Sequence, residues 1–402
     1  RDSGSTGVGV AVAFGWTESS VSTYLGGTGS LDAGNINLTS TLDADNTYKV
    51  EAISGIGDGS KTGIAGSLAI NVAQSNVEAY IDSGASLNLN GSNLSISAIS
   101  DTSTITNAIP HEDGGTSESL GIGASVALAI VDHSTVAYIA DGAMMIGGDA
   151  LAMTATGTHG VETSAIGGAS GASGATTAVP VAAISLIFSD TAVVIGTGDM
   201  LSFGGDISLN ATHNSSVITN GEGDAEGGSS AVGIAFGLTV DEQTSMVKVL
   251  RDLTTTSGAI ALVSSGSMRS KTNAKAAASG SQQEGDQEGT ADSQGQAQAD
   301  FAQNQSQART GQQSTPENQT NPSTSNGGGS LTVAAALAIN IQDTDIVTEL
   351  GNGITLDADQ SIEMKALSNV DSWAVGDGSA TQGTCLLYTS DAADDNRVGG
   401  GG

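Results

Sequence analysis

The chain has 402 residues, of which 43 are acidic and only 11 are Lys or Arg, so its formal net charge is −32. Nucleic acids and anionic lipid headgroups need basic residues as partners, and we therefore predict no nucleic-acid binding. Glycine is abundant at 57 residues, whereas aromatic residues make up only 3%, which disfavours a compact core built on large rings. This composition favours narrow layers of aliphatic side chains stacked in an array.

The first elements in the chain already repeat. Tyr24 precedes Tyr80 by 56 residues, and Tyr80 precedes Tyr138 by 58, within segments of the same design. In later units Val194 and then Lys248 take the same place. A fixed period of this size indicates stacked structural repeats.

We assign five such units to residues 1–280 and a sixth to residues 330–384, each of about 56 residues. The chain begins at Arg1 in the middle of the pattern, without a signal peptide. We interpret it as an internal fragment of a longer protein.

Within a unit the hydrophobic pattern has the period of a β-strand. The larger residues Ile122, Val126, Leu128 and Ile130 alternate with small ones, which suit a face closely approached by a neighbouring layer. We expect about five short strands per unit and no helix. The predicted fold is all-β, a parallel β-helix (β-solenoid) in which each unit contributes about two coils.

An array of immunoglobulin-like β-sandwiches is the alternative fold, since it also consists of short strands and turns. The chain lacks a core Trp pattern, has only 4 Pro, and repeats at a period well below the ~100 residues of such a domain. The β-helix is therefore the favoured prediction.

Two segments depart from the repeat pattern. Residues 281–329 are rich in Gln, Ser, Gly and Asn, with Phe301 as the one large apolar residue, and we predict a disordered insertion. Residues 385–402 resemble nothing upstream, and the peptide from Cys385 to Asp394 is what a transposon-based sequencing adapter would encode. We interpret this tail as a sequencing-adapter artefact, which would include the chain's single cysteine.

No apolar run reaches the ~18 residues that a membrane-spanning helix needs, so we predict no membrane-spanning segment in this fragment. The four histidines, at positions 111, 133, 159 and 213, show no metal-ligand spacing. His133 and His159 could stack on neighbouring coils, but we interpret both as surface turn residues. We expect no metal and no other cofactor.

A β-helical polysaccharide-degrading enzyme would need two carboxylates beside the scissile bond, or acids combined with basic residues. The acidic pairs Glu112-Asp113, Asp224 with Glu226, and Asp241-Glu242 lie in or beside predicted turns, mostly without Lys or Arg nearby. We interpret them as solvated acids, and the segment 221–226 as an acidic loop rather than a calcium site. The chain is therefore predicted not to be an enzyme, although this class and a glycan-binding module remain the alternatives.

Tyr24, Tyr80 and Tyr138 are the most suggestive side chains. If the residues that follow them point inward, the three rings point outward at the same place in successive units. Outward Tyr residues can stack on sugars or anchor a protein partner, and they can equally pack against neighbouring groups. The three form a possible contact stripe for an unknown surface, glycan or protein ligand.

The units, with GIGASVALAI followed by TVAYIADGA and DALAMTA, resemble the repeats of giant bacterial filamentous adhesins of the leukotoxin type, which are similar in design to filamentous haemagglutinin. The resemblance covers about residues 4–280 and 330–384. It implies a β-helical rod that is secreted or tethered to the outer membrane and exposed at the bacterial cell surface for attachment. It carries over no site residue.

Overall fold

A computed structural model describes residues 6–31, 33–56, 60–110, 116–172, 174–280 and 331–381. In these ranges all regular secondary structure is β-strand, and the long strands pair in parallel, which confirms the predicted parallel β-helix. The predicted insertion, the tail at 385–402 and His111 lie outside the described residues.

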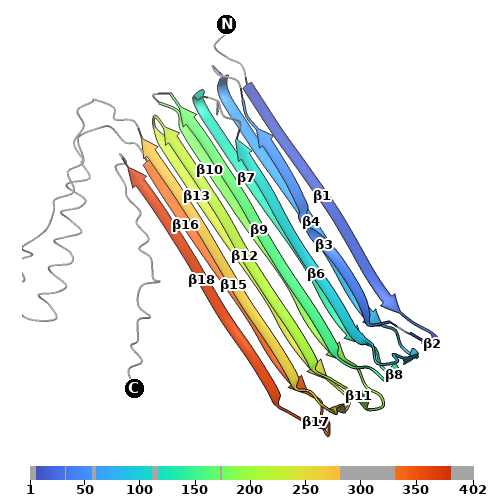
Figure 1. Ribbon diagram of the computed structural model, residues 1–402. Helices are drawn as coiled ribbons and strands as arrows, with labels where there is room; N and C mark the ends of the chain where they lie inside the picture. The colour runs from blue at the N-terminus through green and yellow to red at the C-terminus, as the bar shows by residue number, and fades with distance from the viewer. Residues whose placement is uncertain are drawn as a thin grey trace, which may run out of the picture.

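The β-helix has two walls of long strands (Figure 1). The first wall stacks, in order, β1 (Thr6–Leu25), β4 (Ser60–Ile81), β7 (Thr116–Ile139), β10 (Thr176–Ile195), β13 (Ser230–Val249) and β16 (Leu331–Leu350). The second wall stacks β3 (Asn35–Ser54), β6 (Asn93–Pro110), β9 (Leu151–Gly171), β12 (Ile207–Gly227), β15 (Ile260–Gly280) and β18 (Ile362–Thr381).

Three-residue strands close one end of every coil. They are β2 (Thr28–Ser30), β5 (Ser86–Asn88), β8 (Met144–Ile146), β11 (Leu201–Phe203), β14 (Leu253–Thr255) and β17 (Leu356–Ala358). Figure 1 shows them gathered at the lower end of the long strands, and we call this the turn end. Glycines with positive φ make the tight bends there, for example Gly84 at 71° and Gly142 at 73°.

The predicted number of strands per unit was wrong. Each unit forms one coil, with two strands of about 20 residues and one of three, rather than two coils with five short strands. Polar residues in the middle of β7, such as Asp132 and Ser134, look like a turn in the sequence. They lie within a continuous strand, in which Asp132 and Ser134 point outward and the polar side chains of His133 and Thr135 point into the interior.

The strand register pairs the residues that the sequence aligned. Tyr24 lies opposite Tyr80, and Tyr80 lies opposite Tyr138. Tyr138 is paired with Val194, and Val194 with Lys248. Equivalent positions therefore form straight rows along the axis of the β-helix.

The interior is thick at the turn end and thin at the opposite end. Near the turn end the buried residues are large, and they include Ile81, Leu94, Ile139 and Phe203. Toward the other end the core consists mostly of alanines. At Gly123 a Cβ atom would lie 2.2 Å from the carbonyl oxygen of Gly168 on the opposite wall, so only glycine permits this close approach.

The prediction that small residues would face a closely approaching layer is confirmed. Ala127 and Ala129 of β7 point inward and are fully buried. The larger residues between them, such as Val126 and Leu128, point outward from the first wall.

Candidate functional site

The three aligned tyrosines form a ladder on the outside of the first wall. Ile81 and Ile139, which follow two of them, are fully buried, so the rings themselves point outward as predicted. The ring centroids of Tyr24 and Tyr80 lie 5.1 Å apart, and those of Tyr80 and Tyr138 lie 4.6 Å apart. The planes deviate by only 11° and 5°, so the rings are stacked face to face.

Acidic neighbours and partial burial affect the phenol groups. Burial, followed by the negative charge of Glu78, raises the pKa of Tyr138 to about 12. The pKa of Tyr80 is raised too, first by burial and then by the charges of Asp82 and Glu78. The hydroxyls of Tyr80 and Tyr138 therefore stay protonated at neutral pH and can donate hydrogen bonds.

The stacking limits what this Tyr ladder can bind. Both faces of Tyr80 are covered by its neighbours, so a sugar ring could stack only at the ends of the ladder. Tyr24 lies at one end and is 58% exposed. The ladder thus offers one free ring face and a row of hydroxyls, while its stacking contributes to the stability of the coils.

The histidines form a second row, inside the β-helix. The interpretation of His133 and His159 as surface turn residues was wrong, because they lie within β7 and β9 and are only 1% and 2% exposed. His213 of β12 is fully buried as well. The rings of His133 and His159 are stacked with centroids 4.5 Å apart, and the ring of His213 lies 5.3 Å from that of His159.

Hydroxyl groups hold the imidazoles in place. The Ser75 hydroxyl lies 2.6 Å from Nδ1 of His133, and the Thr102 hydroxyl bridges Nε2 of His133 at 3.2 Å and Nδ1 of His159 at 2.9 Å. Thr191 lies 2.8 Å from Nδ1 of His213. Sequence reasoning missed this arrangement, because serine and threonine in a β-strand are usually read as solvent-facing.

Burial keeps these imidazoles neutral. It lowers the pKa of His133 and of His213 to about 4, and it lowers the pKa of His159 well below its ordinary value. Within the described residues, Nε2 of His159 and Nε2 of His213 have no hydrogen-bond partner. Protonating one of these imidazoles would place a positive charge in the desolvated interior, which is energetically unfavourable.

Next to the histidines, β13 contributes a buried acid. Asp241 accepts a hydrogen bond of 2.5 Å from the side-chain amide of Gln243, which also donates to the hydroxyl of Ser215 at 2.6 Å. Burial raises the pKa of Asp241 to about 6. We call the three histidines, Asp241 and Gln243 the buried polar row.

The buried polar row does not have the geometry of a metal site. Over the described ranges, no three His, Cys, Asp or Glu side chains are arranged to hold a metal ion. The rings of His133 and His159 stack on each other instead of pointing their nitrogens at one centre. The row fits a structural role, in which polar side chains define how the two walls meet.

The other acidic residues singled out in the sequence are not brought together. The segment 221–226 is part of strand β12 rather than a loop, which corrects the prediction. Its Glu222 pairs with Lys275 at 2.7 Å, and Glu226 accepts a hydrogen bond from Ser170. Asp241 points inward and Glu242 outward, whereas Glu112-Asp113 lies outside the described residues.

Sequence reasoning also missed Arg251, which follows β13 and is 1% exposed. Its guanidinium donates to the carbonyl oxygens of Gly196, Ala143, Ala140 and Thr197, at 2.5–2.8 Å. The single signal in the sequence was an isolated basic residue directly after a strand in a strongly acidic chain. It connects the turns of three coils, and four of its five N–H donors are bonded to backbone carbonyls.

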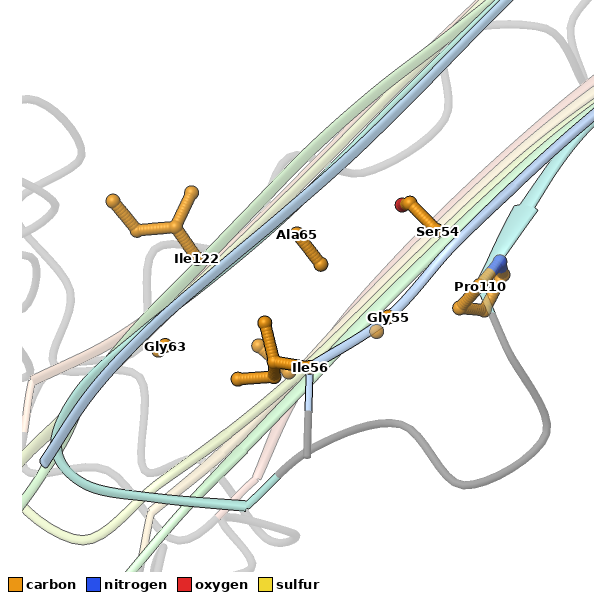
Figure 2. A pocket seen from close by; sticks show the side chains of 10 residues that line it. Ser54, Gly55, Ile56, Gly63, Ala65, Pro110 and Ile122 are labelled. Atoms are coloured by element: carbon orange, nitrogen blue, oxygen red, sulfur yellow. The ribbon is translucent and has the colours of Figure 1, made fainter. Parts of the chain in front are cut away.

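A small cavity lies near the end opposite to the turns (Figure 2). It is lined by Ser54, Ile56, Ala65, Ile122 and neighbouring backbone, and none of its lining residues is charged. Its volume of about 10 Å³ accommodates one water molecule at most. It is not a ligand site.

Comparison with known proteins gives no relative: no family, no curated protein and no solved structure matches this chain. Among the described residues there is no helix that is long and apolar enough to span a bilayer.

Proposed function

We propose that this chain is a stalk segment of a large bacterial adhesin, secreted or exposed at the cell surface, with a structural role in attachment. The observation that carries the proposal is the parallel register that both walls keep over six coils, with register shifts among the described strands only at Leu42/Asn46 and Ser60/Thr62. Each coil adds about 4.8 Å along the axis. Such an array lengthens by adding further coils of the same kind, which is what a stalk requires.

The side chains support a structural role rather than catalysis. His133, His213 and Asp241, whose pKa values are strongly shifted, are buried between the walls, where no substrate reaches them. Several outward acids are paired with lysines, as in Glu51 with Lys49 and Glu349 with Lys248. We therefore assign no catalytic function to the chain.

A glycan-binding module is the second candidate, and one observation favours it. A shallow hollow of about 280 Å³ on the first wall is lined by the polar side chains of Glu18, Gln74, Asn76, Asp132 and Ser134. Carboxylates, amides and hydroxyls of this kind are the usual partners of sugar hydroxyls. The Tyr ladder follows a few residues later on the same strands.

Attachment assays with residues 1–384 distinguish the two candidates. A stalk segment shows no saturable binding to glycan arrays or to cells. Saturable binding that is lost in the Asn76→Ala and Gln74→Ala variants supports the glycan-binding module instead.

A further inference from the structure

The outer surface of the first wall is apolar over nearly half of its length. It consists of alternate residues in the ranges 8–16, 64–72, 122–130, 178–186, 232–240 and 333–341, which the strand register aligns in five rows. Every one of these outward positions is aliphatic, aromatic, Gly or Pro, in a chain whose net charge is −32. We call this surface the apolar face and name its rows by their β7 residues, from Ile122 to Ile130.

The apolar face is open to solvent. Val10, Phe14 and Trp16 are 71%, 64% and 62% exposed, and Ile234 and Leu337 on distant coils are 45% and 54% exposed. Among the described strands, none packs over the outside of the first wall, and Figure 1 shows no second layer there. The large side chains lie outside because the narrow interior accepts only the small ones, such as Ala127 and Ala129.

Its size matches a stable protein interface. Six strands about 4.8 Å apart and nine residues of about 3.3 Å each cover roughly 850 Å². The largest apolar patch of an ordinary monomer is about 300–600 Å², and a standard interface buries about 800 Å² on each partner. A surface of this size therefore needs a partner that covers it.

The chemistry of the chain excludes two other occupants. The segment 281–329 has a single large apolar residue, Phe301, and cannot cover five aliphatic rows. An anionic membrane is disfavoured by the acids that border the face in the next row, Glu18, Asp132, Glu242 and Asp343. A partner must be flat, apolar and not negatively charged where it meets this surface.

We propose that the apolar face packs against the same face of a second copy of the chain. The arrangement of its rows is self-complementary. The Ala124 row forms a shallow groove at Gly66, Ala124, Pro180 and Ala335, and Val10 and Ile234 interrupt it. The Leu128 row forms a ridge and also contains Phe14, Ile70, Ile184, Leu238 and Ile339. The Val126 row lies midway between groove and ridge.

A two-fold axis along the Val126 row, parallel to the axis of the β-helix, places each ridge in the groove of the other copy. The same operation sets the row of Asp132 opposite the row of Leu120, so no carboxylate faces another carboxylate. In this arrangement Glu18 meets Thr6 and Glu242 meets Ser230, whereas Asp132 and Asp343 meet Leu120 and Leu331. An axis along the strands would set the row of Asp132 against itself in reverse order, with Glu18 opposite Asp343. Charge therefore favours the arrangement in which the strands of the two first walls run antiparallel to each other.

Sedimentation velocity and light scattering of the full chain test the proposal. We expect a particle of twice the 39.4 kDa chain mass that dissociates on dilution. The variants Val126→Lys and Leu337→Lys bury an unpaired ammonium in the paired state, so each should raise the dissociation constant about 100-fold or more. Ser134→Lys, on the same strand β7 but outside the apolar face, is the matched control and should remain a dimer.

Two further measurements keep the test independent of folding defects. Circular dichroism should show the same β-sheet signal in all variants, because the substituted side chains point to solvent in the monomer. Fluorescence of an apolar-surface dye per chain should rise when the unmodified protein is diluted below its dissociation constant. A monomeric unmodified chain, or a dimer that both lysine variants leave intact, overturns the proposal. So does a monomer that floats with phosphatidylcholine vesicles, which identifies a lipid surface as the occupant.

Discussion

The guanidinium of Arg251 donates a hydrogen bond of 2.5 Å to the carbonyl oxygen of Ala143, a residue 108 positions earlier in the chain. The two residues belong to turns of different coils, and Arg251 also binds carbonyls in the turn at residues 196–197. One side chain thus joins three successive turns. This is a rare long-range contact in a fold whose strands otherwise contact their immediate neighbours.

Replacing Arg251 with Ala should destabilise the turn end by about 3–5 kcal/mol, because four carbonyl oxygens lose a donor and a cavity remains. Urea unfolding measures the total loss, and hydrogen exchange at residues 140–143 and 196–198 localises it. Arg251→Lys should lose less stability than Arg251→Ala but remain less stable than the unmodified protein, since an ammonium cannot reproduce the planar arrangement of guanidinium donors. Unchanged exchange in the Ala variant would show that the turns hold without this residue.

The buried histidines should make the fold sensitive to mild acid. Burial lowers the pKa of His133 and His213 to about 4. Between about pH 4 and 6.5 these histidines are therefore protonated in the unfolded chain but neutral in the folded chain. Their contribution to stability is therefore complete above about pH 6.5, the ordinary pKa of histidine, and is lost as the pH falls toward 4. Urea midpoints measured across this range should decline, and the decline should be smaller in a His213→Gln variant.

Asp241 should make the stability of the fold depend on pH in the opposite direction. Because burial raises its pKa to about 6, the folded chain holds this proton more tightly than the unfolded chain does. Its stabilising contribution is complete below about pH 4 and is lost as the pH rises through 6. Asp241→Asn should therefore stabilise the protein at pH 7, by about 1–3 kcal/mol, and the gain should vanish near pH 4. A gain that is equal at both pH values would mean that ionisation of Asp241 is not its cause.

Sequence reasoning predicted the class of fold and the alignment of coils. Repeated alternation around Tyr24, Tyr80 and Tyr138 identified the positions that the parallel register pairs, because each coil must place the same kind of side chain at the same level. The number of coils per unit was missed. His133 was interpreted as a surface turn residue, whereas the strand continues through this level and the imidazole points into the interior.

The buried polar row could not be found from one sequence. His133 and His159 are surrounded in the chain by Ser, Thr and Gly, which are typical of exposed turns. Their burial depends on Ser75 and Thr102, hydroxyls from other strands that approach only when the coils stack. Arg251 is similar, since its four acceptors are backbone atoms with no sequence signature.

Removing the central ring of the Tyr ladder should lower stability. Tyr80→Ala abolishes two stacked contacts, each worth about 0.5–1.5 kcal/mol, so a loss of about 1–3 kcal/mol is expected. Tyr80→Phe keeps the ring and serves as the control. Replacing all three tyrosines with Ala tests the contact stripe: weaker attachment with an unchanged melting temperature assigns them to binding, whereas lower stability with unchanged attachment assigns them to packing.

Excising residues 281–330 should leave the β-helix intact. Gly227 is paired with Gly280, and Ser230 is paired with Leu331. In the earlier coil only residues 228–229 connect the two strands, so a Gly-Ser linker placed between Gly280 and Leu331 spans the same gap. The excised chain should keep its β-sheet circular dichroism, and its melting temperature should equal or exceed that of the parent, because a shorter loop costs less closure entropy.

A variant that joins Gly280 directly to Leu331 is the matched control. Its strands β15 and β16 lack the two residues needed to cross between the walls, so the sixth coil should detach from the fifth. Hydrogen exchange in β16 and β18 detects this detachment, because their amides lose the parallel partners in β13 and β15. Loss of protection in the Gly-Ser variant as well would mean that the sixth coil depends on residues 281–330.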